Sequence, residues 1–136
     1  MTQHHKYFQG INTIKFEGPA TDNPLAFRWY DPEKIIGGKT MRNHLRFACA
    51  YWHSFCGNGN DPFGGPTHNF AWNKHANAVD RAKDKMDAAF EFMTKIGLDW
   101  YCFHDVDVVD YGDDVVENER RLQALTNHAQ AHMKAT

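Results

Sequence analysis

The chain has 136 residues, of which 42% are hydrophobic and 14% aromatic, a length and composition typical of a single domain with one modest core. Fifteen Lys and Arg residues against 17 Asp and Glu residues give a net charge of −2, which argues against nucleic acid or an anionic membrane surface as a partner. No apolar leader is evident at the N-terminus and no apolar window is long enough to span a bilayer, so secretion and membrane insertion are disfavoured.

The three cysteines, Cys49, Cys56 and Cys102, are an odd number. Two of them lie in apolar runs, where a thiol usually acts as a small buried hydrophobic group. We therefore expect reduced thiols and a cytoplasmic protein, whose partners are other proteins or small molecules.

Residues 1–40 are expected to form an irregular N-terminal arm. Clusters of Gly, Pro, Asn and Asp interrupt every apolar stretch in this part of the chain, and such clusters break periodic structure. Large aromatic side chains need a surface to bury against, which an irregular arm cannot supply, so we expect the arm to pack on a larger body. The aromatic residues concerned are Phe8, Phe16, Phe27, Trp29 and Tyr30.

An apolar and aromatic run at residues 45–55 follows the arm and ends at a turn cluster over residues 56–62. Its composition favours a strand. A helix remains possible for its first half, because residues 40–44 could supply a helical turn that leads into it.

Two helices are predicted from apolar residues that recur every three or four positions. The first covers residues 78–96, with a cap at Asn77, an acidic first turn at Asp80 and a stop at Gly97. The second covers residues 115–133, with Asp114 and Glu117 as a capping pair. Its apolar stripe consists of Leu122, Leu125, Ala129 and Met133.

A buried strand is predicted at residues 99–104, between the two helices. The order strand, helix, strand, helix describes two consecutive βα units, which form parallel sheets covered by helices. A closed (β/α)8 barrel needs about 250 residues, so the chain looks truncated after two units. The predicted fold class is therefore α/β: an N-terminal arm at residues 1–40, and at residues 41–136 the first two βα units of an incomplete TIM barrel.

His104 and Asp107 follow the second predicted strand and are the principal candidates for catalysis. A carboxylate that accepts a hydrogen bond from one imidazole nitrogen orients the ring and leaves the other nitrogen free to handle a proton. In the alternative interpretation these residues simply cap the end of a strand. Asp105 and Asp107 could also be ligands of a hard cation, but nothing nearby completes a shell of oxygen ligands.

Three further features of the sequence bear on a possible site. Cys102 with His104, or His53 with Cys56, could suggest zinc, but we identify no C-x-x-C or H-x-x-x-H pair. Two residues on one face of a strand do not form a tetrahedral site alone, so no structural zinc is expected. Trp52 at the end of the first run is either a core residue or the wall of a ligand site. Phe63 lies in a loop rich in Gly and Pro, where a large apolar side chain docks into a neighbouring subunit, caps a pocket or anchors the loop on its own chain.

Four segments together resemble the N-terminal part of xylose isomerase, in the longer subclass that carries an N-terminal arm. They are residues 103–107 (FHDVD), 61–65 (DPFGG), 23–27 (NPLAF) and 38–41 (GKTM). The resemblance implies a TIM barrel, a homotetramer and an intramolecular oxidoreductase of carbohydrate metabolism. Such an enzyme interconverts aldoses and ketoses, such as D-xylose and D-xylulose, by ring opening and a 1,2-hydride shift.

The resemblance also implies roles for individual residues. His104 would contact the sugar oxygens and assist ring opening, Asp107 would orient it, and Trp52 would line the apolar side of the sugar. Phe63 would reach into the active site of the neighbouring subunit.

The cofactor implied by the family is a pair of Mg²⁺ ions, with Mn²⁺ or Co²⁺ possible, whose ligands come from later strands outside this chain. No metal ligand is therefore expected within the chain, and the chain alone is expected to be inactive, because no Lewis acid would polarise the carbonyl during the hydride shift. Its expected partners are a pentose or hexose sugar and further copies of the chain or a complementary barrel fragment. Two alternatives remain: a self-associating structural module, in which open sheet edges pair, and a metal-free sugar-binding fragment.

Overall fold

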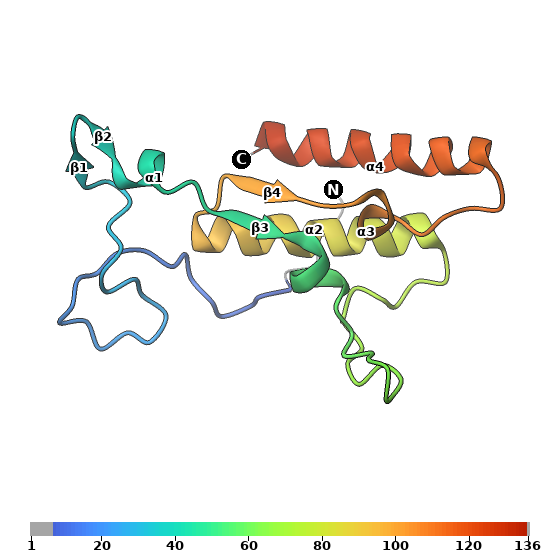
Figure 1. Ribbon diagram of the computed structural model, residues 1–136, viewed down its shortest axis with the longest axis horizontal. Coiled ribbons are helices and arrows are strands. Elements are labelled where there is room, and N and C mark those ends of the chain that lie inside the picture. The colour runs from blue at the N-terminus through green and yellow to red at the C-terminus, as the bar shows by residue number, and fades with distance from the viewer. Residues whose placement is uncertain (1–6, 136) are drawn as a thin grey trace.

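The computed structural model describes residues 7–135 (Figure 1). Two helices, α2 and α4, run alongside a small parallel sheet, while the arm and a long loop extend from this body. In chain order the elements are β1 (Ile35–Ile36), β2 (Lys39–Thr40), α1 (Met41–His44), β3 (Ala48–Ala50), the π-helical turn η1 (Trp52–Cys56), α2 (Ala78–Ile96), β4 (Trp100–Cys102), α3 (Asp105–Val108) and α4 (Val115–Ala135).

The helix predicted at residues 78–96 is confirmed as α2. The Asn77 side chain accepts hydrogen bonds from the backbone nitrogens of Val79 at 2.8 Å and Asp80 at 3.2 Å, which satisfies donors that the first helical turn leaves unpaired. Gly97 ends the helix with a φ of 71°, a left-handed conformation that suits glycine. One face of α2 is buried and supplies much of the core.

The parallel pairing of the two predicted strands is confirmed, with Ala48 opposite Trp100 and Ala50 opposite Cys102. The prediction of a strand over the whole 45–55 run is wrong. The strand β3 is short and η1 follows it, so the helical part lies in the second half of the run. Tyr51 and Phe55 are buried whereas His53 is exposed; a continuous strand would put all three on one face, and a helical turn turns His53 outward.

The strand β4 lies within the predicted range, but the prediction that it is buried is wrong. Trp100 and Cys102 are exposed and Tyr101 is half-buried. Only Tyr101 faces the helices, and its ring lies 5.5 Å from that of Phe90 on α2. Within residues 7–135, β3 and β4 pair only with each other, so the outer edge of each strand lacks a partner strand in this part of the chain.

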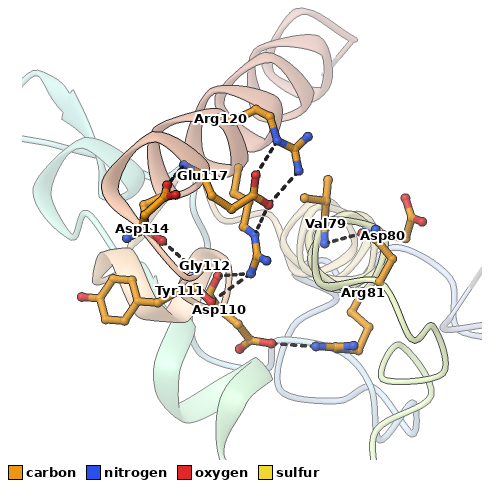
Figure 2. A network of polar contacts seen from close by, with 12 residues as sticks. Val79, Asp80, Arg81, Asp110, Tyr111, Gly112, Asp114, Glu117 and Arg120 are labelled. Carbon is orange, nitrogen blue, oxygen red and sulfur yellow. Dashed lines mark hydrogen bonds and ion pairs between the residues drawn. The ribbon is translucent and has the colours of Figure 1, made fainter.

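The second predicted helix is confirmed as α4, which ends at Ala135 and packs against α2. Asp114 caps it, accepting a hydrogen bond from the backbone nitrogen of Glu117 at 2.8 Å. The Glu117 carboxylate does not return to the cap: it binds Arg120 and Arg121 at 2.7 Å each (Figure 2). Arg121 in turn donates to the backbone oxygens of residues 110 and 111, which fixes the turn before the helix.

The predicted apolar stripe of α4 is confirmed only in part. Leu125 is fully buried and Ala129 is half-buried against the core. Leu122 and Met133 are exposed. No helix within residues 7–135 combines the length and the apolar character needed to cross a membrane.

Most of the described arm is irregular, apart from the antiparallel pair β1 and β2. Glu91 on α2 accepts a hydrogen bond from the backbone nitrogen of Tyr7 at 2.7 Å, and Lys95 donates to the backbone oxygen of Phe8 at 2.8 Å. The start of the arm therefore packs on α2 as expected. Trp29 does not, since 82% of it is exposed.

Candidate functional site

Two of the predicted site residues lie beyond the carboxyl ends of the paired strands. Trp52 begins η1 and is separated from β3 by Tyr51 alone, while His104 follows β4 and precedes α3. Because β3 and β4 are parallel and adjacent, these ends meet at one edge of the sheet. The rings of Trp52 and His104 lie 4.7 Å apart between centroids, at an interplanar angle of 43°.

Asp107 contacts the His104 ring directly. Its Oδ2 atom lies 2.9 Å from His104 Nδ1. An ionised carboxylate can only accept, so Nδ1 donates the hydrogen and Nε2 keeps a lone pair in the neutral ring. The Asp107 side chain is 10% exposed, against 65% for that of His104. The pair therefore consists of a fixed carboxylate and a ring that faces outward.

Contacts with His104 and with η1 hold Asp107 in place. Its carboxylate also accepts from the backbone nitrogen of His104 at 2.8 Å, and its backbone oxygen lies 3.6 Å from the Cys56 thiol of η1. Lys85 on α2 approaches that thiol at 3.6 Å. Burial raises the pKa of Cys56, an effect that the Lys85 ammonium partly offsets, so this thiol is a structural contact rather than a reactive group.

The Asp105 carboxylate has different hydrogen-bond partners from the Asp107 carboxylate. It accepts hydrogen bonds from the Tyr111 hydroxyl and from the backbone nitrogen of Val106, both at 2.9 Å, and the Tyr111 bond lowers its pKa. Asp105 and Asp107 therefore do not share a ligand shell.

Phe63 is 97% exposed and lies in the tight turn between the paired residues Asp61 and Gly64, which forms the tip of a loop. This loop, between η1 and α2, extends from the body (Figure 1). The neck of this loop is closed by Asn58, whose backbone oxygen accepts from the nitrogens of Thr67 and His68 at 3.0 and 2.9 Å. At the tip, the Asp61 carboxylate accepts from the backbone nitrogen of Phe63 at 2.7 Å. Phe63 therefore does not anchor the loop on the described part of its own chain.

One cluster was missed by the sequence analysis. Asp87 on α2 and His128 and His132 on α4 bring three potential metal-ligand atoms within 4.8 Å of one another, and no other such group forms within residues 7–135. The signal was present in the sequence, since His128 and His132 form an H-x-x-x-H pair, whose members share a helix face. The expectation that the chain holds no H-x-x-x-H pair is therefore wrong, and Asp87, 41 residues before His128, carries no local signal of its own.

No family model matches the chain. Its sequence is similar to that of xylose isomerases, however, over 96% of its length: it is 52% identical to a xylose isomerase of Bacteroides thetaiotaomicron, 53% to xylose isomerase 1 of Xanthomonas axonopodis pv. citri and 50% to one of Phocaeicola vulgatus. The chain spans about 30% of the length of each of these relatives. The resemblance indicated by the four motifs is therefore confirmed.

Proposed function

We propose that this chain, related to the xylose isomerases over 96% of its length, supplies the sugar-contacting segment of an aldose–ketose isomerase that converts D-xylose to D-xylulose. The observation that carries the proposal is the His104–Asp107 pair beside the Trp52 ring, where two parallel strands end. An apolar ring surface next to an oriented imidazole suits a sugar, which has an apolar face and a rim of hydroxyl groups.

In this proposal His104 is the proton acceptor for ring opening. The lone pair on Nε2 takes the proton of the sugar's anomeric hydroxyl, the C1 carbonyl forms as the bond between C1 and the ring oxygen breaks, and the imidazolium returns that proton to the ring oxygen. Asp107 is a positioning residue that fixes the ring and stabilises the imidazolium as it forms. Trp52 forms the apolar wall that orients the sugar.

The family resemblance implies two divalent cations, which in such an enzyme would polarise the substrate oxygens during the hydride shift. The described residues around His104 do not fit such a pair, because Asp107 is bound to His104 and Asp105 to Tyr111. We therefore assign the ligands of these cations to sequence outside this chain. The isolated chain accordingly binds sugar without isomerising it.

The open sheet supports the proposal that residues 41–136 are the first two βα units of a TIM barrel, with residues 1–40 as an arm. Further strands, from a complementary barrel segment, would pair with the edges of β3 and β4. Phe63 would extend into the active site of a second copy in a homotetramer. The unpaired thiols of Cys49, Cys56 and Cys102 fit a cytoplasmic location.

A self-associating module is the second candidate, and one observation favours it. An apolar hollow of 650 Å³ lies at the amino end of β4, and exposed Leu45, Phe47 and Trp100 contribute to its lining. It lies away from His104 and Trp52, which are at the other end of the sheet. Exposed apolar surface of this kind is typical of an interface.

The proposal is tested with a chimera in which the matching 131 residues of this chain replace the corresponding part of the Bacteroides thetaiotaomicron relative. We expect the chimera to convert xylose to xylulose with Mg²⁺ or Mn²⁺, and the isolated chain to give no turnover. A folded chimera without activity would refute the proposed role. Turnover by the pure isolated chain would show that the metal ligands are not missing from it.

The two alternatives are separated by measurements on the isolated chain. A native mass that rises with concentration, without calorimetric binding of xylose, would favour the self-associating module. Saturable xylose binding by a monomer, in the absence of metal and combined with an inactive chimera, would favour a sugar-binding fragment.

A further inference from the structure

Asp87, His128 and His132 meet where α2 and α4 pack together. The Nε2 atoms of both histidines lie 2.6 Å from the same carboxylate oxygen, Asp87 Oδ1. All three side chains are about four-fifths buried, with exposed fractions of 20%, 24% and 18% in sequence order. The cluster is therefore partly shielded from solvent but can be reached from it.

The local sequence places these groups on facing surfaces. His128 and His132 are one helical turn apart on α4, so their side chains lie on the same face. Their rings are 4.9 Å apart and nearly perpendicular, at 81°. Phe90, one turn after Asp87 on α2, stacks on the His132 ring at 4.6 Å with an interplanar angle of 13°. This packing restricts the ring and so favours ligand binding by a site that is already formed.

We propose that Asp87, His128 and His132 bind a transition-metal ion of the Zn²⁺ class and thereby join α2 to α4. Two imidazole nitrogens and one carboxylate oxygen suit Zn²⁺, Ni²⁺, Co²⁺ and Cu²⁺, whereas Mg²⁺ and Ca²⁺ prefer oxygen ligands alone. Three protein ligands leave one tetrahedral position for water. This site does not depend on the proposed isomerase function.

The convergence of the three groups supports a metal site over a pair of ordinary hydrogen bonds. Both nitrogens approach one oxygen at 2.6 Å, below the usual N–H···O range of about 2.7–3.2 Å. Around a tetrahedral ion with bonds of about 2.0–2.1 Å, the ligand atoms would stand about 3.3 Å apart. Each of the two nitrogen–oxygen separations would therefore lengthen by about 0.7 Å on metal binding, which is within reach of side-chain rotation.

The first test is a titration of the native chain with Co²⁺ and Zn²⁺ after removal of metal by a chelator. We expect one equivalent of Co²⁺ to give the visible absorption of a tetrahedral site without a thiolate-to-cobalt charge-transfer band, because no cysteine belongs to the cluster. Added Zn²⁺ should displace the bound Co²⁺ and abolish this absorption. At a free Zn²⁺ concentration about 100 times the dissociation constant, the melting temperature should rise by about 5–10 °C.

Substitutions of the three cluster residues test whether they bind the metal ion. Asp87→Asn, His128→Gln and His132→Gln should each weaken Zn²⁺ binding by at least about 100-fold, since even groups that only support metal ligands are worth about 10- to 100-fold. His75→Gln is the matched control. His75 pairs with one carboxylate, that of Asp84, at 3.1 Å, and Asp84 lies on α2 as Asp87 does. Every variant is made with His4 and His5 replaced by Ala, so that the histidine pair near the N-terminus does not contribute.

If the substituted chains fail to fold, NMR of the native chain still tests the proposal. In the native chain, paramagnetic Co²⁺ should broaden the NMR signals of residues around Asp87, His128 and His132 before those around His75. Broadening centred elsewhere, or Zn²⁺ affinity that the three substitutions leave unchanged, would overturn the proposal. So would the absence of any binding of Co²⁺ and Zn²⁺ by the folded native chain.

Discussion

The Oδ2 atom of Asp107 accepts two hydrogen bonds from the same residue, one from the backbone nitrogen of His104 at 2.8 Å and one from its Nδ1 at 2.9 Å. A single buried carboxylate oxygen thus fixes both the backbone that precedes α3 and the orientation of the exposed ring.

Asp107→Asn should lower kcat of the chimera by about 100-fold or more, within the range for impaired general acid–base catalysis. The amide oxygen can still accept both hydrogen bonds, but the charge that stabilises the imidazolium is lost. Measuring kcat/KM for xylose against pH checks this. Asp105→Asn is the control, since that carboxylate binds Tyr111 instead; equal losses in the two variants would contradict the assigned role.

Glu117 should make α4 sensitive to acid. Hydrogen bonds from Arg120, and then Arg121, lower its pKa from 4.5 to about 2. A carboxylate with a lowered folded-state pKa stabilises the fold above its unfolded-state pKa, and this stabilisation is lost as the pH falls through the folded value. The urea midpoint of the native chain should therefore exceed that of Glu117→Gln at neutral pH, and the gap should close between about pH 4.5 and 2.

The exposed Glu119 on the same helix provides the control for this prediction, and Glu119→Gln should not show the same closing gap. A difference between the native chain and Glu117→Gln that stays constant down to pH 2 would show that the carboxylate acts through packing and not through charge.

Tyr51→Phe should stabilise the chain. The Tyr51 hydroxyl is buried and no group within residues 7–135 is placed to hydrogen-bond with it, while burial raises its pKa. Removing an unsatisfied buried hydroxyl should increase the free energy of unfolding by about 1 kcal/mol. Urea denaturation measures this, with Tyr101→Phe as a control expected to change by less than about 0.5 kcal/mol. A loss of stability in Tyr51→Phe would mean that its hydroxyl has a partner.

Phe63→Ala should leave the stability of the isolated chain within about 0.5 kcal/mol, because the side chain is 97% exposed. In the assembled chimera the same change should lower kcat/KM by at least about 10-fold, since the ring would no longer complete the neighbouring site. If the Phe63→Ala chimera is as active as the unsubstituted chimera, Phe63 does not contribute to the neighbouring active site.

The elements that the sequence predicted well are those with local signals. Asn77 and Gly97 mark both ends of α2, and the apolar periodicity between them needs no tertiary information. The sequence does not reveal the helical turn η1, because the apolar and aromatic composition of residues 45–55 suits a strand equally well. The exposure of His53 separates the two structures. The exposure of β4 likewise depends on which neighbours cover it, which a single segment cannot report.

In the candidate site too, local contacts could be predicted from the sequence, whereas contacts that depend on tertiary packing could not. The spacing of His104 and Asp107 allowed their contact to be anticipated, since both lie in one short segment. The contact between Trp52 and His104 required knowledge that β3 and β4 are adjacent and parallel. The cluster of Asp87 with His128 and His132 depends on the packing of α2 against α4, which places groups 41 and 45 residues apart within hydrogen-bonding distance.

The most direct test of the proposed role of His104 uses the chimera that carries His104→Gln. Its rate of metal-dependent xylose isomerisation is compared with that of the unsubstituted chimera and that of the His44→Gln chimera. His44 is an exposed histidine that binds the backbone oxygen of Ile36 and has no assigned role. We expect a loss of about 100- to 10,000-fold for His104→Gln and little change for His44→Gln. An unsubstituted chimera that turns over xylose, together with a His104→Gln chimera of equal activity, would contradict the claim that this chain supplies the proton acceptor for ring opening.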